Sequence, residues 1–257
     1  MSFSIHPDAT RYGFASAGFG AHTSRTMMLV ELQAIMTACP ASANPNDFRV
    51  AAIEQNVLLK QTLDARKNSF RYLQQLYGFN QDLLIFRVLR ELWTVNPKAQ
   101  PQLALLCALA RDPILRTTVE LISATHPGNT LAADQCQQAI MDELGTLLAA
   151  STLASAGRNV FSTWDQAGYL AGAKLKVRQQ VQPLALVTAY ALFLAFLNGE
   201  RGEGIFLSPW CRLLDQPEHV LRTQAEQASQ QGWLEYRSSG QITEVTFRHF
   251  LRDGQNE

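Results

Sequence analysis

The last part of this chain restricts the fold most, because a hairpin pattern follows an otherwise helical sequence. Residues 231–247 read QGWLEYRSSGQITEVTF, and two alternating runs flank an Arg-Ser-Ser-Gly turn. Alternation at period two predicts a two-stranded ribbon. The side chains expected to face the core are Trp233, Ile242, Val245 and Phe247. Those expected at or near the exposed tip are Glu235, Arg237 and Ser238.

Most of the preceding sequence has the spacing of amphipathic helices. We expect helices over about residues 25–38, 46–56, 62–79, 81–95, 99–125 with a break at Pro113, 131–145, 151–166, 184–198, 208–214 and 217–231. The uncharged run at 184–197 gives roughly 21 Å of helix, which is short for the ~30 Å hydrocarbon core of a bilayer. This run therefore predicts a buried helix and no membrane contact.

The order of the final elements predicts a particular module. A buried helix, the short apolar strand IFL, a second helix, a longer polar helix and a ribbon follow one another, as in a winged helix-turn-helix. The ribbon is then the wing, and its strands join IFL in a small sheet. A similar phrase occurs earlier, since Ala-Gly-Tyr-Leu at 167–170 parallels Gln-Gly-Trp-Leu at 231–234. In both phrases the glycine permits a left-handed helix stop.

These patterns predict a mainly α fold: a helical bundle with winged helix-turn-helix modules that carry short β-hairpin wings. We expect three domains: an N-terminal helical or helix-turn-helix domain at 1–95, a middle helical domain with a wing at 96–182, and a C-terminal winged helix-turn-helix domain at 183–257.

Patterns typical of catalysis are weak. The histidines are scattered and are expected at the surface or at helix caps, and Asp112 before Pro113 is expected to cap a helix. The glycines of GFASAGFGAH lack the Lys-Ser/Thr of a phosphate loop. We therefore expect no enzymatic activity, no cofactor and no metal site. The four cysteines form no C-x-x-C pair, and the N-terminus lacks a secretory pattern, so a cytoplasmic location is expected.

Local clusters of charge, and not the net charge of the chain, suggest a polyanionic partner. The chain has 22 basic and 22 acidic residues and a formal net charge of zero, so attraction to a polyanion would have to come from patches. One basic cluster is expected on the helix at 62–79 and just before it: Lys60, Arg66, Lys67 and Arg71. A second is expected around the earlier wing: Arg158, Lys174, Lys176 and Arg178. If 174–178 is a strand, its three cations point the same way.

The helix at 217–231 has a mixed character. Arg222 and several glutamines suit DNA, whereas Glu218 and Glu226 are repelled by phosphate, so this module could contact either DNA or protein. Arg237 at the tip of the last ribbon completes the set of candidate DNA-binding residues.

The segment AIEQNVLLKQTLDARKNSFRYLQQLYGF resembles BrxA, the small helical component of bacterial phage-exclusion (BREX) systems. The opening YGFASAGFGAHTSRTMMLVELQ and the later QLALLCALARDPILR and STLASAGRNVFSTWDQAGYL are similar in order, over about residues 12–170. The resemblance implies a non-enzymatic helical protein that binds duplex DNA beside larger defence proteins. This chain is longer than that family, with an extra module after residue 182, so a related defence system is equally compatible.

The leading hypothesis is a DNA-binding accessory protein of a bacterial anti-phage system that contacts double-stranded DNA phosphates through basic helices and wings. We expect replacement of Lys174, Lys176 and Arg178 by alanine to weaken duplex binding. The alternatives are a scaffold whose winged modules dock larger defence proteins, and a transcriptional regulator. The sequence leaves open the oligomeric state, the DNA preference and the identity of the partners.

Overall fold

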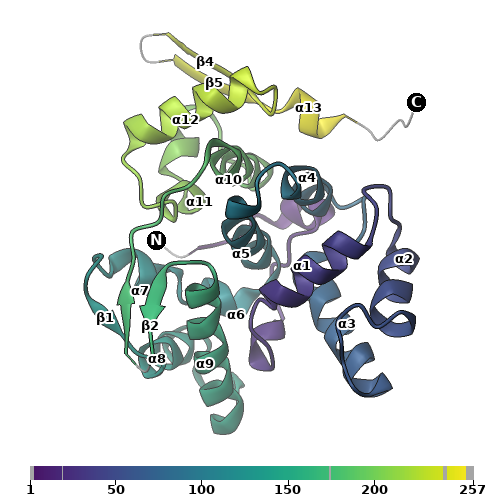
Figure 1. The fold of residues 1–257 in the computed structure, drawn as a ribbon. Coiled ribbons are helices and arrows are strands. Elements are labelled where there is room, and N and C mark those ends of the chain that lie inside the picture. The colour runs from purple at the N-terminus through teal and green to yellow at the C-terminus, as the bar shows by residue number, and fades with distance from the viewer. Residues whose placement is uncertain (1–2, 19, 174, 240–241, 253–257) are drawn as a thin grey trace.

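The computed structural model describes residues 3–18, 20–173, 175–239 and 242–252, and its fold is mainly α (Figure 1). The α-helices are α1 Leu29–Ala38, α2 Pro45–Arg49, α3 Leu63–Tyr77, α4 Leu84–Trp93, α5 Gln100–Arg111, α6 Pro113–Arg116, α7 Val119–Ala124, α8 Ala133–Leu144, α9 Ala150–Gln166, α10 Ala185–Leu197, α11 Pro209–Arg212, α12 Glu218–Gln230 and α13 Arg248–Leu251. Shorter helical turns are η1 Pro7–Tyr12, η2 Ala21–Thr23, the π-helical η3 Val50–Glu54, η4 Pro97–Ala99, η5 Gly145–Leu147 and η6 Gly202–Leu207. The strands are β1 Thr130–Leu131, β2 Leu170–Gly172, β3 Lys176–Arg178, β4 Glu235–Ser239 and β5 Ile242–Thr246.

The first helix begins later than the spacing predicts. Met28 has a left-handed backbone with φ 54°, and α1 starts only at Leu29. The chain at the start of α1 bonds to α9: Met27 N donates to Thr163 Oγ1 (2.9 Å), and Leu29 N, at the first residue of α1, donates to Gln166 Oε1 (3.3 Å). These bonds join residues more than 130 positions apart, which local periodicity cannot reveal.

One core connects the three parts of the chain. α5 packs against α3, α4, α9 and α10, and the buried apolar side chains form a single cluster. The uncharged run becomes α10, most of whose residues are buried, as predicted. Its Tyr190 hydroxyl donates to Ile85 O of α4 (2.8 Å). Among the described residues, no helix is both long and apolar enough to cross a bilayer.

Residues 119–178 form what we call the middle unit: α7, β1, α8, α9, β2 and β3 in that order. Its strands make an antiparallel sheet in the order β1-β3-β2, with Thr130 opposite Val177 and Ala171 opposite Val177 on the other side. The helix expected at 131 starts at Ala133, because Leu131 belongs to β1 and Ala132 is the N-cap of α8.

Residues 185–246 form the C-terminal unit: α10, η6, α11, α12, β4 and β5. The expected strand IFL is wrong, because these residues belong to the 3-10 helix η6. In the described part of the chain, β4 therefore pairs with β5 alone, with Tyr236 opposite Val245. Val245 and Phe247 are buried and Trp233 is half-buried, whereas the side chain of Ile242 lies outside the described part.

The two predicted glycine stops have the same hydrogen bonds. Gly168 (φ 85°) donates to Asp165 O, and Tyr169 N donates to Trp164 O. Gly232 (φ 79°) donates to Ser229 O, and Trp233 N donates to Ala228 O. Both α9 and α12 thus end in a Schellman motif that leads directly into a hairpin.

Candidate nucleic-acid interface

Nine of the ten candidate cations lie in the described part of the chain, and they fall into two groups. Four have exposed side chains and, within the described residues, no carboxylate partner: Lys67, Arg71, Arg158 and Arg237. Five are half-buried or buried and make internal bonds: Lys60, Arg66, Lys176, Arg178 and Arg222. Lys174 lies outside the described residues.

One side of α9 carries a narrow polar stripe, in which Ser151 and Arg158 are exposed and Ser155 and Ser162 are half-buried. Ser151, Ser155, Arg158 and Ser162 follow at intervals of three or four residues, which places them on one side of a helix. Arg158 is exposed and donates to Ser155 Oγ (3.1 Å). The next residue of the stripe, Asp165, pairs with Lys176 Nζ of β3 (2.5 Å), so its charge is compensated.

The three strand cations were expected to point the same way and to contact phosphates, but Arg178 does not reach the surface. Its side chain is buried, and it donates to Ile122 O at the end of α7 (3.1 Å) and to both carboxylate oxygens of Asp215 (2.6 and 2.7 Å). Lys176 also turns inward, lying 5.5 Å from the ring centroid of Phe161. Lys176 and Arg178 do lie on the same side of β3, but that side of the strand faces the helices.

The N-terminal cluster is divided in the same way. Lys60 pairs with Glu31 (2.8 Å), and Arg66 donates to backbone carbonyls, including Ile53 O at 3.3 Å. Lys67 and Arg71, one turn apart on α3, remain exposed. Arg71 lies 4.5 Å from the ring centroid of Tyr72, on the same helix.

The C-terminal unit neutralises its main cation. Arg222 of α12 bonds to Glu218 (2.7 Å) and to Glu203 of η6 (3.2 Å), and it also donates to Tyr236 and Thr243. Burial opposes its charge, but the bonds to Tyr236 and Glu218 outweigh this effect and raise the Arg222 pKa. Glu226 stays exposed on the same helix, so the outer side of α12 carries a carboxylate and lacks the free cation that α9 has.

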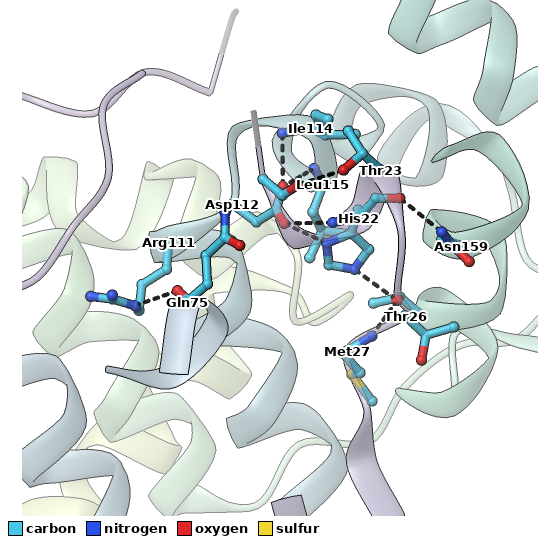
Figure 2. A network of polar contacts seen from close by, with 12 residues as sticks. His22, Thr23, Thr26, Met27, Gln75, Arg111, Asp112, Ile114, Leu115 and Asn159 are labelled. Carbon is cyan, nitrogen blue, oxygen red and sulfur yellow. Dashed lines mark hydrogen bonds and ion pairs between the residues drawn. The ribbon is translucent and has the colours of Figure 1, made fainter. Parts of the chain in front are cut away.

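A buried polar network holds the segment that runs beside α9 (Figure 2). His22 Nδ1 lies 2.7 Å from Asp112 Oδ2, and His22 Nε2 lies 2.9 Å from Thr163 Oγ1. Asp112 also accepts from Ile114 N and Leu115 N and so caps α6, as predicted, whereas the surface position expected for His22 is wrong. Burial alone would raise the pKa of Asp112, but His22 and the backbone N–H donors outweigh it and lower the pKa.

The order His, Asp and Thr is also found in nucleophilic catalysis, but this network is shut off from solvent. His22 and Thr163 are each 0% exposed and Asp112 is 1% exposed. A cavity of about 750 Å³ opens beside α6, α7 and α11, and it is lined by none of these three residues. The network therefore fixes the segment 22–27 between α9 and α6. Among the described residues, no group of three or more His, Cys, Asp or Glu side chains could hold a metal ion.

Sequence reasoning missed Arg25, which it placed at the start of the first helix. In the structure Arg25 is exposed in the non-helical segment before α1, and its guanidinium lies 5.2 Å from the ring centroid of Tyr72. The sequence contained two separate signals, a lone arginine at 25 and a tyrosine at 72 within a basic helix. No local pattern connects the two.

Comparison with known proteins defines only the fold. No family model and no curated protein matches the chain. A solved structure described as "Magnesium ion-bound SspB crystal structure" is similar, with a TM-score of 0.55 and 12% identity over 94% of this chain and 86% of that chain. At this identity the likeness concerns the arrangement of elements alone. The mainly helical architecture is therefore shared along almost the whole chain, while no family is assigned.

Proposed function

We propose that this protein is a non-enzymatic binder of double-stranded DNA and that the middle unit makes the principal contact. We interpret the order helix, strand, helix, helix and hairpin in residues 119–178 as a winged helix-turn-helix in which α9 enters the major groove. The three-stranded sheet and the Schellman end of α9 support this interpretation.

The observation that carries the proposal is the polar stripe on α9. Serine hydroxyls and one arginine can contact phosphates and base edges, whereas an uncompensated carboxylate would be repelled. The single acidic residue of the stripe, Asp165, is paired with Lys176. Because Lys176 of the wing pairs with Asp165, Arg158 is the one charged side chain of this stripe that has no oppositely charged partner among the described residues.

A salt-titrated binding assay tests the proposal. We expect wild-type protein to shift a duplex at low salt, and Arg158→Ala to weaken binding and reduce the slope of log K against log salt by about one unit. Arg201→Ala is a matched control, because Arg201 is also exposed but lies in the C-terminal unit against Phe196. No binding by the wild type at low salt would refute the proposal.

The second candidate function, docking of a partner protein, applies to the C-terminal unit. Its element order is similar, but η6 replaces the first strand, Arg222 is neutralised by Glu203 and Glu218, and Leu207 is exposed. These features fit protein contact better than phosphate contact. Copurification of a partner that is lost on replacing Leu207 by Asp, with DNA binding unchanged, would support it.

The biological setting that we propose is a bacterial anti-phage system, on the basis of the BrxA resemblance in residues 12–170. In that setting the middle unit would hold DNA while the C-terminal unit holds a larger defence component. Loss of phage protection by Arg158→Ala, with unchanged protein levels, is the expected result of a plaque assay.

A further inference from the structure

We propose that Arg25 and Arg71, held on the ring of Tyr72, form a second phosphate contact that extends the DNA-binding surface from α9 to α3. This inference rests on the proposed function, because it assumes that α9 faces a duplex. It gives Arg25 a role in phosphate binding, and it means that the N-terminal part of the chain contacts the same duplex as α9.

The first step is the unusual pairing of like charges. Two exposed guanidinium groups, from Arg25 and Arg71, lie 5.2 and 4.5 Å from the centroid of one ring. Each contact is a cation–π interaction, which restricts the position of the guanidinium over the ring. Within the described residues neither arginine forms an ion pair with a carboxylate. The ring thus holds two exposed positive charges in place, and a bound phosphate would be stabilised by both.

The second step is position. The segment containing Arg25 lies along α9: Asn159 Nδ2 donates to His22 O (2.9 Å), and Met27 N donates to Thr163 Oγ1 (2.9 Å). Residues 159 and 163 are one turn apart, so the segment covers roughly 6 Å of the helix. Arg158 and Ser162 each precede one of these residues and therefore occupy the neighbouring stripe of the helix surface, about 100° away.

The third step is continuity toward α3. The turn η2, just before Arg25, contacts both α9 and α3. In Figure 1 the purple N-terminal segment lies between these two helices. Lys67, one turn before Arg71, adds a further exposed cation on α3. One carboxylate, Asp64, shares that side of α3 one turn before Lys67.

A duplex is the polyanion that fits this arrangement. Duplex DNA carries a negative charge for about every 1.7 Å of its axis, so a rod lying on α9 continues to present phosphates beyond the helix. Arginine contacts to phosphate position the duplex without reading its sequence. Arg25 and Arg71 are therefore expected to contribute affinity that is independent of sequence.

The experiment compares salt slopes for the full chain. Arg25→Ala and Arg71→Ala should each reduce the slope by about one unit, and the double variant by about two, with the same loss on unrelated duplex sequences. Arg25→Lys should restore most of the slope, because a lysine keeps the charge. Arg201→Ala should leave the slope unchanged, and circular dichroism should show that every variant is folded.

The outcomes separate the two proposals. If the wild type binds and Arg158→Ala weakens binding, but the double variant keeps the wild-type slope, the second contact is refuted and the proposed function stands. If the wild type fails to bind any duplex at low salt, the proposed function is refuted and this inference falls with it. If Arg25→Lys binds as poorly as Arg25→Ala, the role of Arg25 is structural and the phosphate contact is refuted.

Discussion

At the scale of single residues, arginines close the carboxyl ends of helices. Arg90 donates to Met36 O and Cys39 O at the end of α1, Arg116 to Leu109 O and Ala110 O at the end of α5, and Arg178 to Ile122 O in α7. The last carbonyls of a helix lack partners within the helix and carry partial negative charge, which a cation stabilises. Burial lowers the pKa of Arg116 to about 10, so it remains charged at neutral pH.

We expect Arg178→Ala to lower the free energy of unfolding by about 3 kcal/mol, because it removes the cation that pairs with the Asp215 carboxylate and the side-chain donor to Ile122 O. Arg158→Ala, at an exposed site, should change it by less than about 0.5 kcal/mol. Urea denaturation at neutral pH measures both. Equal stability of the two variants would contradict the structural role of Arg178. The triple alanine replacement of Lys174, Lys176 and Arg178 is thus a test of stability and not of DNA contact.

The Asp112 carboxylate should make stability depend on acid. Its folded-state pKa is lowered, so its contribution is full above the unfolded value of about 3.9 and is lost as pH falls through the folded value. Asp112→Asn should therefore be less stable than the wild type at pH 7. The difference in the free energy of unfolding between the two proteins should narrow below about pH 4. Unfolding curves from pH 3 to 7 test this, with the exposed Asp82→Asn as the control. A gap that does not change with pH would show that charge is not involved.

The sequence could not distinguish these roles of arginine. Arg158 and Arg178 both occur in polar, basic stretches, yet one is exposed and the other bonds to residue 215, 37 positions away. Asp112 was predictable as a cap because the Asp-Pro pattern is local. Its partner His22, 90 positions away, was not.

At the scale of elements, the two glycine stops end α9 and α12 with the same backbone conformation, so each helix leads into its hairpin in the same way. Gly168 and Gly232 have positive φ, and a Cβ built on either meets no atom within 4 Å. Any cost of adding a methyl group there thus comes from the backbone conformation and not from a clash. The glycine and aromatic pattern was local, so both stops were predicted. β1 and η6 were not: β1 pairs with the distant strand β3, and the short apolar run in η6 has no periodicity that separates a 3-10 helix from a strand.

Gly168→Ala should destabilise the protein by about 1–2 kcal/mol, since an L-residue is strained in the left-handed region. Gly204→Ala in η6 is the matched control, because its φ is not positive and the nearest atom to an added Cβ is 3.8 Å away. Thermal unfolding should show a lower Tm for the first variant only. An unchanged Tm for Gly168→Ala would argue against the Schellman geometry.

At the scale of the whole molecule, the chain behaves as one packed body. α5 contacts helices of the N-terminal part, the middle unit and the C-terminal unit, and the N-terminal segment reaches α10 through His6 N and Asn198 Oδ1 (2.8 Å). The boundaries at 95/96 and 182/183 stay predictions about sequence segments. Periodicity in the sequence located the helices. It could not show that α5 packs against all three parts of the chain, because α5 is apolar all around and its sequence therefore indicates no preferred packing face.

We expect a single cooperative unfolding transition, because separate units would have to expose the surfaces that they bury against α5. Tryptophan fluorescence and far-UV circular dichroism should give coincident urea curves. Trp164 and Trp210, which are fully buried, report on the middle and C-terminal units respectively. Two separated transitions would show that the units fold independently.

The balance of charges has a consequence for how the molecule meets a ligand. The formal sum is zero, yet among the described residues α3 carries the exposed cations Lys67 and Arg71 and α9 carries Arg158, so negative charge must be in excess elsewhere. Such a body has a permanent electric dipole moment. Near a polyanionic rod it experiences a torque, which turns the cationic side toward the rod before contact, although the net attraction at long range stays small.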